Sequence, residues 1–123
     1  MTKYLYPDLS RVILDSANKV HSTLSCGLPE SCYQEALMIE LASRKINSVK
    51  ESVHKVYYAG QQIGYFKSDI IVNDIIILEL KAVDFLSKQH TAQLLNYLKI
   101  TGLKVGFLFN FGGLSLEMKR LIL

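Results

Sequence analysis

The segment over residues 68–83, SDIIVNDIIILELKAV, constrains the fold more than any other part of the chain. Its aliphatic residues flank the Asn-Asp pair 73–74, which predicts a buried β-hairpin with a turn at that pair. The same segment carries Asp69, Glu79 and Lys81. Because charged side chains are rarely buried without a charged partner or a metal ion, the hairpin has to give these three a neutralising environment.

The register of this hairpin decides whether the two acids meet. Glu79 and Lys81 are two residues apart on one predicted strand, so they share a face. A turn centred on Asp74, with an odd number of loop residues, pairs Asp69 with Glu79. A tight two-residue turn pairs Asp69 with Leu78 instead and places the acids on opposite faces. Both faces are apolar, so the sequence leaves both registers open.

The three charged side chains suggest a metal site if the acids converge. Converging carboxylates either share a proton or bind a cation. Two carboxylates and water commonly hold Mg²⁺, with a substrate phosphate completing its shell. Lys81 would then orient an attacking water or stabilise charge on the phosphate. In the alternative, Asp69 and Lys81 form an ion pair at the sheet edge, and Glu79 faces solvent.

Hydrophobic periodicity predicts the remaining elements, with turn signals at Gly60 and Gly64, Pro29 in the first turn of the second helix, and Gly102 as a helix stop. The order ααβββαβ plus one short element predicts an α/β domain, bordering on α+β, with a mixed sheet flanked by helices. The predicted helices cover about 9–24, 29–45 and 87–101, the strands lie in 52–72, 75–83 and 104–111, and the short element, a strand or a turn of helix, lies in 114–123.

Composition sets the wider class of protein. The chain has 123 residues, half of them hydrophobic, which predicts a single packed domain over 1–123. A net charge of +3 permits nucleic-acid binding without arguing for it, and no run interleaves aromatic and basic residues strongly enough to predict a single-strand platform. Cys26 and Cys32 form no metal-binding pattern. With no apolar leader or spanning stretch, we expect a cytoplasmic protein that does not enter a membrane.

Three separated motifs resemble a known family. Asp69 followed by the E-L-K of 79–81 resembles the signature of the PD-(D/E)XK nuclease superfamily. Residues 27–33 fit the pattern GxxExxY, which names a bacterial family of small proteins within that superfamily. Residues 90–102, HTAQLLNYLKITG, and the N-F-G of 110–112 resemble further segments of that family.

The resemblance implies a fold and a chemistry. The fold is a mixed sheet flanked by helices with a metal site at the hairpin, and the chemistry is Mg²⁺-dependent phosphodiester cleavage, with Mn²⁺ as a substitute. Ser68 replaces the proline of the nominal signature, and Lys67 stands where arginine is more usual. The resemblance implies metal binding by Asp69, Glu79 and Glu30, catalysis by these acids and Lys81, and support from Gln93, Tyr97 and Tyr33. Lys67 and Lys88 flank the predicted site in the sequence and are the candidates for phosphate contacts.

We expect the substrate to be DNA, and RNA is the less favoured substrate. Because a small domain offers little surface for a duplex, a homo-oligomer, a partner protein or low sequence specificity is expected. The alternative is a nuclease-fold binding or regulatory module that no longer cleaves and acts with a partner protein. A third interpretation is a structural subunit of a complex, docked through an apolar patch such as residues 121–123.

Overall fold

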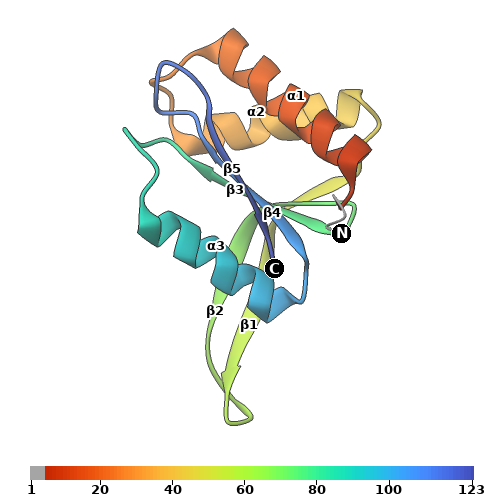
Figure 1. The fold of residues 1–123 in the computed structure, drawn as a ribbon, viewed down its shortest axis with the longest axis vertical. Coiled ribbons are helices and arrows are strands. Elements are labelled where there is room, and N and C mark those ends of the chain that lie inside the picture. Colours follow the sequence, from red (N-terminus) through yellow and green to blue (C-terminus); the bar gives the residue numbers. More distant parts are fainter. Residues whose placement is uncertain (1–4) are drawn as a thin grey trace.

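The computed structural model describes residues 5–123, and this part holds three helices and five strands in the predicted order. The short C-terminal element is a strand, and the fold is α+β with a mixed sheet flanked by helices (Figure 1). The elements are α1 (Pro7–Leu24), α2 (Glu30–Ser43), β1 (Ser48–Tyr58), β2 (Gln61–Val72), β3 (Ile76–Lys81), α3 (Lys88–Thr101), β4 (Val105–Asn110) and β5 (Glu117–Ile122).

The strands form one sheet in the order β1-β2-β3-β4-β5. Neighbouring strands are antiparallel except β3 and β4, which are parallel. A parallel pair needs a crossover connection, and α3 provides it. Every residue of β4 is buried, as expected for a strand covered on both faces.

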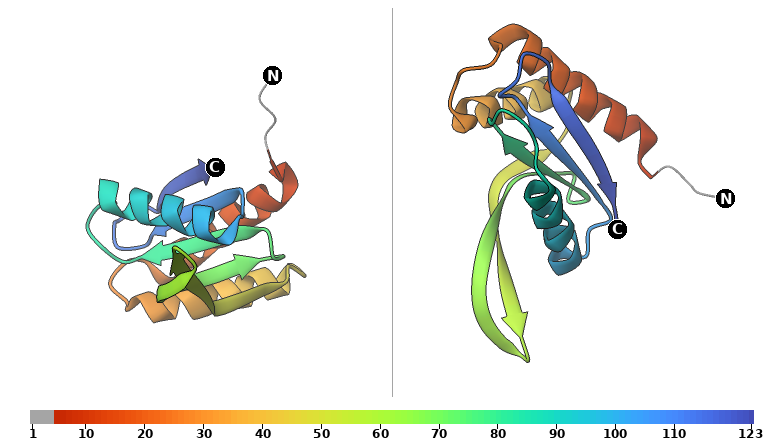
Figure 2. Two further views of the ribbon diagram at one scale, coloured as in Figure 1. Left: turned by 90° about the horizontal axis from the view of Figure 1, so that it is seen from below. Right: turned by 60° about the vertical axis from the view of Figure 1, so that its left-hand side comes forward.

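The sheet separates two hydrophobic clusters. Helices α1 and α2 cover one face and α3 covers the other (Figures 1 and 2). Leu78 and Leu80 of β3 belong to the cluster under α1 and α2, whereas Ile77 packs with Leu94 and Leu98 of α3. Since strand side chains alternate, the odd positions of β3 face α3.

The β2–β3 hairpin has the wider of the two turns considered from the sequence. Ile70 pairs with Leu78, and residues 73–75 form a three-residue loop centred on Asp74. The first two loop residues have left-handed φ values of 50° and 59°, which Asn and Asp tolerate better than most residues. Continued by one step, this register places Asp69 opposite Glu79, so the tight-turn register is wrong.

Some element boundaries differ from the prediction. Pro29 precedes α2 as its N-cap in an extended conformation, instead of lying in the first turn. Gly64 lies within β2, where the β1–β2 register shifts, so of the two glycine signals only Gly60 marks the turn. Strand β1 begins at Ser48, earlier than the β-branched composition suggested.

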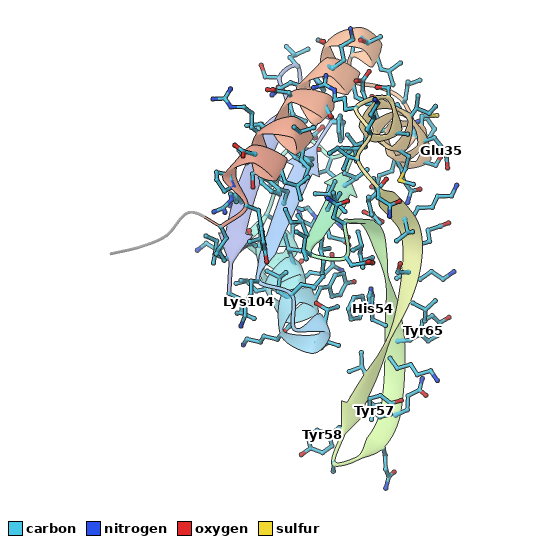
Figure 3. All side chains as sticks on the ribbon, turned by 90° about the vertical axis from the view of Figure 1, so that its right-hand side faces the viewer. Glu35, His54, Tyr57, Tyr58, Tyr65 and Lys104 are labelled. Atoms are coloured by element: carbon cyan, nitrogen blue, oxygen red, sulfur yellow. The ribbon has the colours of Figure 1, made fainter. Side chains whose placement is uncertain are left out.

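Strands β1 and β2 continue beyond the sheet as a two-stranded ribbon, which we call the hairpin arm (residues 53–67). Strand β3 pairs with β2 only as far as Ile70. The arm extends away from the body of the molecule, with Tyr57 and Tyr58 near its tip (Figures 2 and 3). Its base is fixed to α3, because the ring of Phe66 stacks on that of Tyr97 with centroids 3.7 Å apart. Within residues 5–123, no helix has the length and apolar character needed to cross a bilayer.

Candidate active site

The buried Glu79 and the half-buried Asp69 form a pair where β2 and β3 part. The backbone N–H of Asp69 donates to Oε1 of Glu79 at 3.2 Å, and the N–H of Leu80 donates to Oδ2 of Asp69 at 2.7 Å. The main chain of each strand thus orients the acid of the other. Glu79 is only 4% exposed, so the alternative in which it faces solvent is wrong.

The pair binds a proton unusually tightly. Burial, together with repulsion from Asp69, raises the pKa of Glu79 to about 8. Burial also raises the pKa of Asp69, although the hydrogen bond from the Leu80 backbone opposes this. At neutral pH Glu79 therefore retains a proton. A divalent cation would displace that proton and let both carboxylates ionise, so the pair has the chemistry of a cation site.

Helix α3 contributes polar side chains on the same side of the sheet. Nζ of Lys81 donates to Oε1 of Gln93 at 3.2 Å, which directs the ammonium group. Lys81 lies close enough to both acids to lower their pKa values, but it forms no ion pair with Asp69. Burial raises the pKa of Tyr97, and the charges of Glu79 and Asp69 raise it further. The structure therefore brings Lys81, Gln93 and Tyr97 together with the acid pair.

Glu30, the first residue of α2, approaches the pair from the other side of the sheet. Burial of its carboxyl group raises its pKa, as does the charge of Asp69, while Lys81 and a hydrogen bond with the Ala82 backbone lower it. Glu30 and Asp69 line one cavity of about 270 Å³. The other residues that line this cavity are Ser31, Gln34, Glu51 and Leu80.

Two of these residues were not singled out from the sequence. Gln34 donates from Nε2 to the carbonyl oxygen of Asp69 at 2.9 Å, so α2 helps to position the acid. Glu51 lies across from Asp69 in the β1–β2 register, has a left-handed φ of 55°, and raises the pKa of Asp69. Gln34 follows Glu30 by one helical turn and could have been found on that basis. No sequence pattern pointed to Glu51, because its proximity to Asp69 depends on the pairing of β1 with β2.

Tyr33 supports the site from a distance. Its hydroxyl donates to the carbonyl oxygen of Ser25 at 2.6 Å and accepts from the N–H of Leu28 at 3.2 Å. These bonds hold the loop between α1 and α2, where Gly27 has a φ of 109° that favours glycine. Within the motif over 27–33, the glycine and the tyrosine shape the loop, and the acid reaches the cavity.

The N-F-G segment over 110–112 fixes the chain that follows Lys81. The buried side chain of Asn110 accepts from the N–H of Val83 at 3.0 Å and donates to its carbonyl oxygen at 2.9 Å. Gly112 packs so closely that a Cβ would lie 2.2 Å from the Val83 oxygen. The loop after β3 is thereby held against the end of β4.

The two predicted lysines lie on the surface. Lys67, on β2, and Lys88, the first residue of α3, are both exposed. His90 caps α3 through two hydrogen bonds with Ser87. The backbone N–H of Ser87 donates to Nδ1 of His90, and the backbone N–H of His90 donates to Oγ of Ser87.

The donor set fits a metal ion held by few protein ligands. Within residues 5–123, no three His, Cys, Asp or Glu side chains are placed to hold an ion together. Mg²⁺ needs only one or two carboxylates, since water and substrate phosphate complete its shell. Asp69 and Glu79 meet that requirement, and the place of Glu30 as a third ligand stays a prediction.

Comparisons with solved structures agree with this fold. The structure described as "Crystal structure of SSO0001" matches with a TM-score of 0.60 and 17% identity, over 75% of this chain and 48% of that one. The present chain therefore spans about half the length of that protein. The alkaline exonuclease LHK-Exo from Laribacter hongkongensis matches over 86% of this chain and 75% of its own, at 10% identity and a TM-score of 0.40, which is too low for an argument.

Comparison with protein families is more specific. No curated protein matches the sequence. The family model described as the PD-(D/E)XK nuclease superfamily matches residues 7–121, a range that includes every candidate residue named above. The chain belongs to the PD-(D/E)XK nuclease superfamily.

Proposed function

We propose that this protein is a metal-dependent nuclease that hydrolyses phosphodiester bonds of DNA, with RNA a less favoured substrate. The Asp69–Glu79 pair with Lys81 beside it carries the proposal. Superfamily membership supports it. We also propose that residues 1–123 act as one domain of the GxxExxY family, which the arrangement of residues 27–33 supports.

The side chains of the site would have separate tasks. Asp69 and Glu79 would hold Mg²⁺, or Mn²⁺ as a substitute. When bound, the ion would neutralise charge on the scissile phosphate and lower the pKa of a water molecule. Lys81, directed by Gln93, would stabilise the negative charge that develops on the phosphate during in-line attack.

Other residues would support these steps. Glu30 faces the cavity beside Asp69 and would contact the ion or its waters. Tyr97 would donate a hydrogen bond to the substrate phosphate, because its hydroxyl lies in the field of the acid pair. Lys67 and Lys88 would contact phosphates on either side. The free thiols of Cys26 and Cys32 are compatible with a reducing compartment such as the cytoplasm.

Cleavage of circular and linear DNA, single- and double-stranded, tests the proposal. Wild-type protein is incubated with the DNA in Mg²⁺, in Mn²⁺ and in EDTA, and the Lys81→Ala variant is assayed in parallel. Cutting that needs the metal and is lost in Lys81→Ala establishes the nuclease. Absence of cutting by the wild type, together with metal binding that Asp69→Ala abolishes, refutes it and favours a silent module acting with a partner protein.

A further inference from the structure

The hairpin arm presents two different faces. His54 and Phe66 pair across the arm on the inner face, with ring centroids 4.9 Å apart, and Phe66 stacks on α3. Lys55 pairs with Tyr65 on the opposite, outer face, and alternation places Lys67 there too. Figure 3 shows Tyr65 on the outer side of the ribbon and His54 on the side of α3.

The arm exposes large side chains that the fold does not need. Tyr57, Tyr58 and Tyr65 are 60%, 74% and 64% exposed. Val53 and Ile63 on the arm are also exposed. Five large exposed apolar or aromatic side chains within one short hairpin are typical of a binding surface.

The charge of the arm selects the kind of partner. Residues 53–67 contain Lys55 and Lys67 and no acid, although the whole chain has 11 acids. An anionic partner is therefore favoured over a second copy of the arm, which carries the same charge. Ammonium groups beside exposed tyrosine rings match the chemistry of unpaired nucleic acid, since lysines hold its phosphates and rings stack on its bases. A duplex offers no free base faces to the rings.

The outer face leads into the candidate active site. Tyr65 and Lys67 lie exposed on the outer face, and the half-buried Asp69, two residues further along β2, lines the cavity beside α2. At about 3.3 Å per residue, Tyr65 lies roughly 13 Å along the strand from Asp69. A nucleic-acid strand that lies along the arm therefore reaches the acid pair at its base.

We propose that the outer face of the hairpin arm binds an unpaired DNA strand and guides it to the Asp69–Glu79 pair. This inference rests on the proposed nuclease function and deepens it, because it names single-stranded DNA as the substrate.

Binding of a fluorescein-labelled oligo-dT strand, followed by anisotropy in EDTA, tests the contribution of the rings. Tyr65→Ala and Tyr57→Ala each weaken binding about tenfold, since each removes a stacking surface. Tyr65→Phe keeps the ring and binds like the wild type. Ile39→Ala is the matched control, because Ile39 is an equally exposed apolar residue on α2.

The salt dependence of the same binding tests the lysines. Lys55→Ala and Lys67→Ala each reduce the slope of log K against log salt concentration by about 0.7, the value for one lost phosphate contact on a single strand. Lys19→Ala, on the exposed surface of α1, leaves the slope unchanged.

Three results would overturn the inference. One is equal binding of oligo-dT by the wild type and Tyr65→Ala, and another is tighter binding of a DNA duplex or of oligo-U than of oligo-dT. The third is a wild-type dimer, detected by light scattering, that Tyr57→Ala and Tyr65→Ala dissociate, since a second copy would then be the occupant.

Binding without metal separates this inference from the proposed nuclease function. A wild type that binds oligo-dT through the arm but never cuts DNA upholds the arm and refutes the nuclease. Cutting of single-stranded DNA that Tyr57→Ala and Tyr65→Ala leave unchanged upholds the nuclease and refutes the arm.

Discussion

The two halves of strand β2 have different surroundings. Residues 68–72 lie in the sheet with β1 on one side and β3 pairing from Ile70 onward on the other, whereas residues 61–67 pair with β1 alone. Residues 68–72 are buried or half-buried, whereas residues 61–67 are exposed or half-buried. The catalytic candidate Asp69 thus lies in the half of β2 that is held between two neighbouring strands. The exposed side chains suited to binding a partner lie in the half that pairs with one strand only.

The largest expected effect comes from comparing a lysine at the candidate active site with a lysine on the hairpin arm. Lys81→Ala is expected to lower kcat by about 10²–10³-fold, because it removes a charge that stabilises the transition state. Lys67→Ala is expected to raise KM and leave kcat unchanged, since a phosphate contact on the arm is the same in ground and transition states. Steady-state cleavage of single-stranded DNA measures both. A lower kcat in Lys67→Ala would contradict the division.

A matched pair of isoleucines tests whether the two halves of β2 contribute differently to the stability of the protein. Ile70→Ala is expected to lower the free energy of unfolding by about 2–5 kcal/mol, because the side chain is fully buried and its loss leaves a cavity. Ile63→Ala, on the exposed arm, is expected to change it by less than about 0.5 kcal/mol. Urea unfolding of both variants checks this, and similar losses would show that the arm is packed in solution.

The stability of the metal-free protein is expected to depend on pH through the Asp69–Glu79 pair. The pKa of Glu79 is 4.5 in the reference state and about 8 in the folded protein, and that of Asp69 shifts in the same direction. The folded state therefore holds a proton that the unfolded chain releases. The contribution of this pair to stability is fully present below pH 4.5 and is lost as pH rises through about 8.

Urea midpoints across this pH range in EDTA measure the effect. Glu79→Gln is expected to flatten the dependence, because it removes the titrating group, whereas Lys67→Gln on the arm leaves it unchanged. Addition of Mg²⁺ is expected to restore stability at high pH, since the ion binds the ionised pair. A pH dependence that persists in Glu79→Gln would assign it to other groups.

The smallest expected effect concerns the attachment of the arm. Phe66→Leu removes the stack on Tyr97 and is expected to cost about 1 kcal/mol. Amide hydrogen exchange should accelerate in residues 53–67 and stay unchanged in residues 68–72, because only the arm depends on this contact. Tyr65→Leu on the outer face serves as the control, and acceleration there too would argue against a fixed inner face.

The sequence predicted much of the fold and the identity of the main side chains. Element order follows from local periodicity, and the chain between Pro7 and Leu24 or between Lys88 and Thr101 carries enough apolar repeats to specify a helix. Asp69, Glu79 and Lys81 stood out because charges are unexpected in an apolar hairpin. Boundaries were less certain at Pro29 and Gly64, since proline and glycine each suit more than one backbone position.

Only the tertiary structure decided which residues meet. Both faces of the β2–β3 hairpin are apolar, so the pairing of Asp69 with Glu79 was settled by packing between the two helical layers. Glu51 joined the site through strand pairing that no local pattern reveals. The outer face of the hairpin arm arises in the same way, because pairing sets Lys55 beside Tyr65, ten residues further along the chain. Periodicity reports which side of an element is buried, whereas contacts between elements depend on how those buried sides pack together.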